Sequence, residues 1–319
     1  MGSAGVAVPF IIGFAASMLF GFNLVTSLFV SAALTATSIG ITAAVLKEMK
    51  KIDTETAKLI LGAAVIDDVL GLLVLSLVQS VPAGFSVEIV FTVIKAVLFI
   101  GLAFVFGERF IPKMVDRFDL RVLDPKVTFM LAMCMAFGYA FVAEWIGLSA
   151  VVGAFVAGLS LSRSLNVVFF KKGTEYLEVI FTSIFFVSLG IIVNVSALFT
   201  SAMLIIALTI IAISTKLVGC GFVARKLGYS KKDSMIVGIG MIPRGEIAFI
   251  IGLYGLLAGV ITQEIYSALV FMAFITTLIT PYLLKRAYKS EQAVKKEKVV
   301  RIKTALEKKP VVKVGAPKS

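Results

Sequence analysis

Two adjacent carboxylates, Asp67 and Asp68, stand in the middle of an apolar run from about Lys58 to Val81. The run is long enough to cross a bilayer, because a membrane helix needs about 20 apolar residues. An aspartate near the bilayer centre costs at least ~2.5 kcal/mol to insert, and such groups usually mark a functional site. Carboxylates are suitable ligands for both protons and small hard cations. A group for which a cation and a proton compete is the minimum requirement for exchanging the cation against protons.

Neighbouring residues on a helix point about 100° apart. We therefore expect one aspartate to face a cavity and the other to lean toward a neighbouring helix. Lys216 lies near the middle of a second apolar run, 198–226, too far from either end to reach the surface easily. Charge neutralisation predicts an acidic partner for it, and both Asp67 and Asp68 lie at similar depth. A buried lysine also gives up its proton readily. The alternative for all three residues is a purely structural ion pair.

The composition indicates a polytopic membrane protein and argues against enzymes. The chain has 319 residues, of which 59% are hydrophobic and 16% charged, and its mean hydropathy is +1.03. It has no histidine, which excludes imidazole metal sites and Ser-His catalysis. An intramembrane aspartyl protease needs two aspartates from separate helices, and here they are adjacent. Cys134 and Cys220 lie in separate apolar stretches and are predicted to be core thiols.

Ten membrane segments can be drawn along the chain. Basic residues occur only in alternate connections between them, and the positive-inside rule then places both termini in the cytoplasm of a plasma-membrane protein. The basic stretch 289–319 is predicted to be a cytoplasmic tail near anionic lipid rather than a binder of nucleic acid. The segments are 6–22, 26–50, 54–80, 86–108, 127–145, 148–163, 174–193, 198–226, 232–258 and 262–284.

Segments 26–50 and 232–258 are predicted to be broken helices, because hydroxyls, glycines and a proline interrupt them near the middle. They run in opposite directions. Two such helices in corresponding places indicate an inverted-repeat transporter with its site at the membrane midplane. Each is the middle member of a helix, broken helix, helix triplet, the first triplet ending at 80 and the second beginning at 198.

The residues at the breaks are candidate site-lining groups. Thr37 and Ser38 offer hydroxyls and freed carbonyls, and the positive dipole end of the half-helix after them could be offset by Asp67 or Asp68. Pro243 interrupts the second helix. Arg244 and Glu246 could pair locally or across to the other broken helix, in a structural or coupling role. The alternative for the hydroxyls is helix packing.

Four motifs in matching order over residues 6–288 resemble the second branch of the monovalent cation:proton antiporter family, which includes bacterial and archaeal sodium/proton antiporters. The resemblance implies an all-α fold in which the two broken helices cross beside the site. It implies that Asp67 and Asp68 bind cation and protons and that Lys216 pairs with Asp67. The motifs are Ala36-Thr37-Ser38, Val65-Ile66-Asp67-Asp68-Val69-Leu70-Gly71, Phe185-Phe186-Val187-Ser188-Leu189-Gly190 and Gly240-Met241-Ile242-Pro243-Arg244-Gly245-Glu246.

The resemblance also implies a homodimer whose protomers each have a core domain and a dimerisation domain. The expected division is 1–80 for the first core triplet, 81–197 for a linker helix and dimerisation-type segments, and 198–288 for the second core triplet. The family usually has about thirteen membrane segments, so the chain is expected to lack the first three.

The expected function is exchange of Na⁺ for H⁺ by alternating access, with no cofactor. Li⁺ or K⁺ could take the place of Na⁺, and a potassium/proton antiporter on the same scaffold is the nearest alternative. The others are an inverted-repeat carrier of an organic anion with sodium and an N-terminally truncated, non-transporting fragment.

Overall fold

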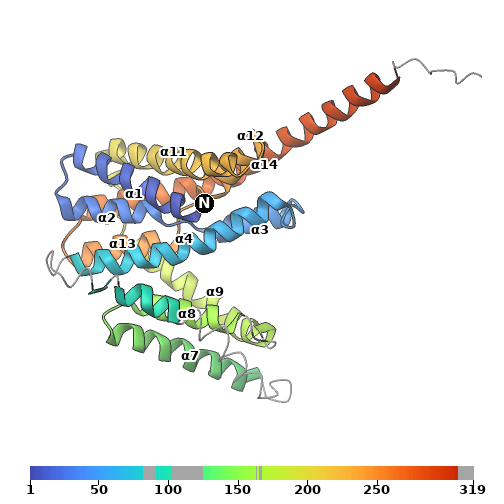
Figure 1. Ribbon diagram of the computed structural model, residues 1–319. Helices are drawn as coiled ribbons and strands as arrows, with labels where there is room; N and C mark the ends of the chain where they lie inside the picture. Colours follow the sequence, from blue (N-terminus) through green and yellow to red (C-terminus); the bar gives the residue numbers. More distant parts are fainter. Residues whose placement is uncertain (82–90, 93, 103–124, 163, 165–166, 308–319) are drawn as a thin grey trace, which may run out of the picture.

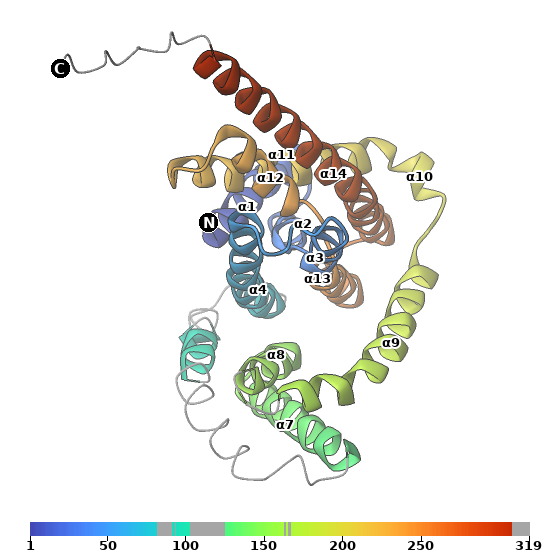
Figure 2. The ribbon, with the colours of Figure 1, turned by 90° about the vertical axis from the view of Figure 1, so that its right-hand side faces the viewer.

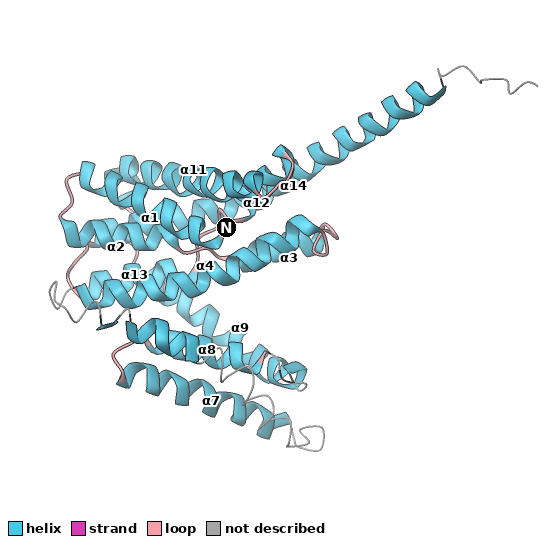
Figure 3. Cartoon of the chain, in the orientation of Figure 1, coloured by secondary structure: helices cyan, strands magenta, loops and turns pink. Residues whose placement is uncertain are grey.

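The computed structural model describes residues 1–81, 91–92, 94–102, 125–162, 164 and 167–307. Every regular element in this part of the chain is helical (Figure 3). The labelled helices are α1 (Gly2–Leu19), α2 (Leu24–Thr35), α3 (Ile39–Glu48), α4 (Glu55–Ser80), α7 (Pro125–Trp145), α8 (Ala150–Leu161), α9 (Val167–Ile192), α10 (Ala197–Thr200), α11 (Ala202–Lys226), α12 (Lys231–Gly240), α13 (Glu246–Leu257) and α14 (Gln263–Glu307).

Most of these helices form one bundle. In it α1 packs against α2, α4 and α11, and α14 packs against α11, α12 and α13 (Figure 1). The hairpin of α7 and α8 lies beside the bundle, and α9 runs along the outside toward α10 (Figure 2). The C-terminal part of α9 is hydrogen-bonded to α14, because the Tyr266 hydroxyl donates to the Leu189 carbonyl at 3.3 Å.

Short polar residues mark where several apolar helices begin. The Asn23 side chain accepts a hydrogen bond from the Thr26 amide at 2.8 Å at the start of α2. Ser230 accepts one from the Asp233 amide at 3.1 Å at the start of α12. Each cap satisfies one of the backbone donors that a first helical turn leaves free. The helices themselves are apolar on nearly every side, so these polar caps mark where the loops end and the helices begin.

Two helices are interrupted, and their interruptions meet. The backbone is extended at Ala36 and Ser38, between α2 and α3, and the second interruption covers residues 241–245, between α12 and α13. The Ser38 amide donates to the Pro243 carbonyl at 2.9 Å, so the two breaks satisfy each other's backbone groups. Both predicted breaks are therefore present.

Gly245 allows this close approach. A Cβ atom at this position would lie 2.5 Å from the Ser38 Cβ and 2.7 Å from its hydroxyl oxygen, closer than real contacts allow. A second cross-contact lies beside it, because the Thr42 hydroxyl of α3 donates to the Gly240 carbonyl at 2.7 Å. The two broken helices are thus held together by one backbone hydrogen bond and one hydroxyl-to-carbonyl bond, with a glycine at the tightest point.

Two clusters of buried apolar side chains fill the bundle. The first draws on α2 and α13, and the second on α3 and α12, so the halves of each broken helix belong to different clusters. Helices α4, α11 and α14 run through both. The breaks therefore divide the core into two layers joined by continuous helices.

Five helical stretches of the described chain are long and apolar enough to cross a membrane: Gly2–Leu19, Leu24–Glu48, Glu55–Ser80, Ala202–Lys226 and Gln263–Lys289. An all-helical, polytopic membrane protein is confirmed. The total of ten segments stays a prediction, and most of segment 86–108 lies outside the described residues.

Some boundaries differ from those predicted. α9 begins at Val167 rather than at 174, and α14 continues to Glu307, so much of the predicted tail is helical. Hydropathy marks where lipid contact ends, whereas Lys, Glu, Gln and Ala continue a helix into water. Cys220 is buried as predicted. Cys134 is exposed on α7, so its prediction as a core thiol was wrong.

Candidate functional site

A buried ion pair joins two of the continuous helices. The Lys216 ammonium on α11 donates to Oδ1 of Asp67 on α4 at 2.8 Å, and both side chains are 0% exposed. The acidic partner predicted for Lys216 is therefore Asp67. The other oxygen, Oδ2, has no hydrogen-bond partner among the described residues. An ion pair so poorly supported by further hydrogen bonds contributes little stability, so stability alone does not explain why it is kept.

The pair lies where the two apolar layers meet. On α4, Ala64 belongs to one cluster and Leu72 to the other, and Asp67 falls between them. On α11, Ala212 and Cys220 belong to different clusters and flank Lys216 in the same way. The charges thus occupy the level at which both broken helices lose their regular backbone.

Asp68 points in another direction from Asp67. It is half-buried rather than enclosed, and it lies within electrostatic range of Asp67, Lys216 and Glu246. One turn further along α4, the Gly71 Cβ position would lie 3.7 Å from the Ile247 side chain, so this part of α4 meets the start of α13. Asp67 leans toward a neighbouring helix, as expected for one of the two aspartates. A cavity facing Asp68 and the roles of both aspartates in ion binding stay predictions.

Arg244 links three elements at the breaks. Its guanidinium is almost fully buried and donates to the carbonyls of Ala36 at 3.1 Å and Ala212 at 2.9 Å, with a longer contact of 3.4 Å to Thr35. Ala36 and Thr35 lie at the C-terminal end of α2. Backbone carbonyls there have no partner within the helix, and the helix dipole is negative at this end. Within the described residues no carboxylate lies in ion-pair range of Arg244. Its contact across to the other broken helix is made to backbone carbonyls rather than to an acid.

The remaining predicted residues lie around the breaks. Glu246 is exposed as the first residue of α13, where a negative charge complements the positive helix end. Thr37 is buried, and its hydroxyl has no partner in the described part of the chain. Ser38 and Pro243 make the backbone bond between the breaks. Thr277, which sequence reasoning did not single out, donates from its hydroxyl to the Arg244 carbonyl at 3.1 Å.

A cavity of about 590 Å³ opens beside the breaks. Its polar lining comes from Ser38, Arg244, Glu246 and Thr277. Helix α9 contributes Phe186 and Leu189 to its apolar wall. Phe186 packs edge-on against Phe249 of α13, with ring centroids 5.8 Å apart. The cavity thus lies between the broken helices and the α9 side of the molecule.

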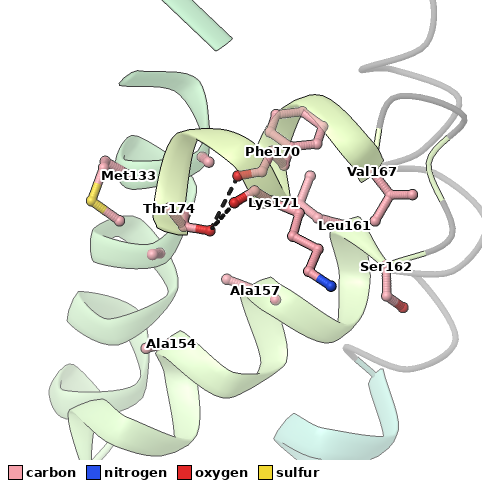
Figure 4. A pocket seen from close by; sticks show the side chains of 12 residues that line it. Met133, Ala154, Ala157, Leu161, Ser162, Val167, Phe170, Lys171 and Thr174 are labelled. Atoms are coloured by element: carbon pink, nitrogen blue, oxygen red, sulfur yellow. Dashed lines mark hydrogen bonds between the residues drawn. The ribbon is translucent and has the colours of Figure 1, made fainter. Parts of the chain in front are cut away.

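A second cavity, of about 380 Å³, lies between α7, α8 and α9 (Figure 4). Small side chains such as Ala154 and Ala157 line it, together with Lys171 and Thr174. The Thr174 hydroxyl donates back to the Phe170 and Lys171 carbonyls of its own helix at 3.2 and 3.1 Å. None of the predicted site residues lines this cavity.

A buried ion pair at the meeting point of two interrupted membrane helices is a feature of ion-handling membrane proteins. A family model described as sodium/hydrogen exchanger, transmembrane, matches residues 1–288. The chain therefore belongs to the sodium/hydrogen exchanger family. Members of this family are transporters rather than enzymes.

Individual relatives agree with this assignment. The chain is 33% identical over 286 residues to the Na(+)/H(+)-K(+) antiporter GerN of Bacillus cereus, covering 89% of this chain and 73% of the relative. It is 33% identical over 307 residues to the high-affinity Na(+)/H(+) antiporter NhaS3 of Synechocystis, covering 92% and 66%. It is 26% identical over 272 residues to the K(+)/H(+) antiporter 1 of Saccharomyces cerevisiae, covering 82% and 31%.

Proposed function

We propose that the protein is a secondary active transporter that exchanges Na⁺ for H⁺ across a membrane. The observation that carries the proposal is the fully buried Lys216–Asp67 pair beside the half-buried Asp68, in a chain of the sodium/hydrogen exchanger family. Such a pair is kept despite its desolvation cost when its charges take part in function.

In the proposed cycle, cation and protons compete for Asp67 and Asp68. When the cation is absent, Lys216 neutralises Asp67. An arriving Na⁺ takes the place of the lysine at Asp67, and carboxylate oxygens are ligands that small hard cations accept. Protons bound on one side of the membrane are released on the other before the cation binds. The gradient of one ion then drives transport of the other.

The scaffold is proposed to work by alternating access. The triplets in 1–80 and 198–288 form an inverted-repeat core that carries the site between inward- and outward-open states, and 81–197 holds the dimerisation-type segments of a homodimer. The same proposal includes a ten-segment topology with both termini cytoplasmic. It also includes a plasma-membrane location and a cytoplasmic tail in 289–319.

At the breaks, Thr37, Ser38, Pro243 and Glu246 are proposed to line the site. Arg244 has a coupling role, because its guanidinium connects the end of α2 to α11 one turn before Lys216. A movement of one broken helix is then transmitted to the helix that carries the lysine.

Exchange of K⁺ is the second candidate. The printed names of the relatives from Bacillus cereus and Saccharomyces cerevisiae include K⁺. Cation selectivity depends on the size of the site and on its ligands. Competition between Na⁺, Li⁺ and K⁺ at several pH values separates the two candidates.

The test uses purified protein in liposomes that contain a pH-sensitive dye. We expect added Na⁺ to drive proton flux with the unaltered protein, Asp68→Asn to abolish it, and the exposed loop variant Asp53→Asn to keep it. Persistence of Na⁺-driven flux in Asp68→Asn would contradict the assignment of the site. Sodium-coupled uptake of a labelled organic acid without proton flux would contradict the exchange itself.

A further inference from the structure

Helix α1 lies directly over the buried ion pair and contacts it through a glycine. A Cβ atom at Gly5 would lie 2.9 Å from Oδ1 of Asp67, 3.3 Å from Nζ of Lys216 and 3.1 Å from the sulfur of Cys220. The first of these separations is shorter than real Cβ contacts. The α1 backbone therefore reaches both partners of the pair, and no side chain intervenes.

Helix α1 is packed too closely against α4 and α11 to move away from the ion pair. On the α4 side, a Cβ atom at Gly2 would lie 2.7 Å from the Ala63 carbonyl oxygen. On the α11 side, one at Gly219 would lie 3.3 Å from the Ala4 carbonyl oxygen. Since α1 touches backbone on both sides, a side chain added at position 5 is accommodated most easily by displacing the ends of Asp67 and Lys216.

The ion pair has hydrogen-bonding capacity that the protein does not fill. An ammonium has three donors, and among the described residues Lys216 makes one hydrogen bond, to Asp67. Oδ2 of Asp67 accepts none from the described part of the chain. On the α1 side, Gly5 has no side chain that could supply the pair with a further hydrogen-bond partner.

We propose that Gly5 is a positioning residue for the exchange site: its backbone holds Asp67 against Lys216 and so sets how strongly the lysine competes with the transported cation for Asp67. The inference rests on the proposed function for its transport consequence. A larger residue at position 5 lengthens the ion pair, and a weaker pair leaves Asp67 more available to the cation.

Transport by Gly5→Ala is the first test, with Gly13→Ala as the matched control. Gly13 lies on the same helix and is equally tight, because its Cβ position is 2.7 Å from the end of Leu34, but it does not contact the pair. We expect the apparent KM for Na⁺ to fall about fivefold in Gly5→Ala, with a smaller change in maximal rate. Gly13→Ala should keep the original KM. An unchanged KM in Gly5→Ala, or an equal shift in both variants, overturns the proposal.

Thermal unfolding in detergent is the second test, and it does not depend on transport. If Gly5 acts through the pair, Gly5→Ala lowers the melting temperature of the original protein but has roughly half that effect or less in a Lys216→Ala background, because Asp67 is then free to turn away. Gly13→Ala should have the same effect in both backgrounds. Additive effects of Gly5→Ala and Lys216→Ala contradict the inference.

The two tests also separate this inference from the proposed function. If the unaltered protein moves no protons in response to Na⁺, the exchange proposal fails, while the unfolding cycle still decides whether Gly5 acts on the pair. If Gly5→Ala alone does not fold, recovery of folded protein in the Lys216→Ala background supports the inference, and failure of the double variant when Lys216→Ala alone folds overturns it.

Discussion

The ammonium of Lys216 lies 2.8 Å from Oδ1 of Asp67, and neither side chain has any exposed surface. Continuous helices carry both residues, yet the pair sits at the level where the two broken helices are interrupted. The charges are therefore fixed to the rigid part of the bundle, while irregular backbone lies next to them. This arrangement places an ion pair with spare hydrogen-bonding capacity beside the part of the fold best able to rearrange.

Removing one partner of this pair should destabilise the protein more than removing both. Asp67→Leu leaves a buried, unpaired ammonium and should cost about 3–5 kcal/mol, whereas Asp67→Leu combined with Lys216→Met should recover most of that loss. Unfolding in detergent measures the difference. Glu55→Gln, which removes the exposed pair with Lys58, is the control and should cost less than ~1 kcal/mol. Equal losses in the single and double variants would contradict this account.

Asp68 should matter for transport and much less for stability. It is half-buried and is not part of the enclosed pair, so Asp68→Asn leaves no stranded buried charge. We expect loss of Na⁺-driven proton flux with a change in unfolding free energy within about 1 kcal/mol. Flux and melting temperature measured on the same preparation test both parts. A large loss of stability would mean that Asp68 has a structural role instead.

The charged residues of the candidate site stand out in the sequence because buried charge is costly. Asp67, Asp68 and Lys216 are conspicuous in apolar runs, and their cost predicted a partner for the lysine. The breaks were predictable for a related reason, since hydroxyls, glycines and a proline in mid-membrane disfavour a helix.

The close contacts were not predictable in the same way. Gly5 and Gly245 matter because of the atom that faces each of them, and that depends on how helices distant in sequence pack together. Arg244 illustrates the same limit. Its charge signalled a buried partner, but the partners are carbonyls freed by the other broken helix, which no spacing in the sequence identifies.

Arg244→Lys should destabilise the meeting point of the broken helices. A lysine cannot reach the carbonyls of Ala36 and Ala212 together, as the planar guanidinium does. Leaving one buried carbonyl unpaired should cost about 1–3 kcal/mol of unfolding free energy. Arg225→Lys is the matched control, because Arg225 donates to the Tyr229 carbonyl at 2.9 Å on the exposed surface. Similar losses in both variants would show that burial of Arg244 is unimportant.

Gly245→Ala should separate the two breaks. Its new methyl group would overlap Ser38, and the backbone bond from Ser38 to Pro243 would lengthen. We expect lower thermal stability and slower exchange, with partial recovery when Ser38→Gly is added. Gly62→Ala on α4 is the control, because nothing lies within 4 Å of its Cβ position. A Gly245→Ala protein as stable and active as Gly62→Ala would exclude a need for this close approach.

Competition between cation and protons has a defined pH signature. If both bind the same carboxylates, acidification should raise the apparent KM for Na⁺ while leaving the maximal rate at saturating Na⁺ nearly constant. For competition by one proton, each unit of pH below the titration of the carboxylate should raise KM by up to about tenfold, since the proton concentration rises by that factor. Initial rates measured over a range of Na⁺ concentrations at several pH values give both quantities. A pH dependence confined to the maximal rate would place the protons at a site separate from Asp67 and Asp68.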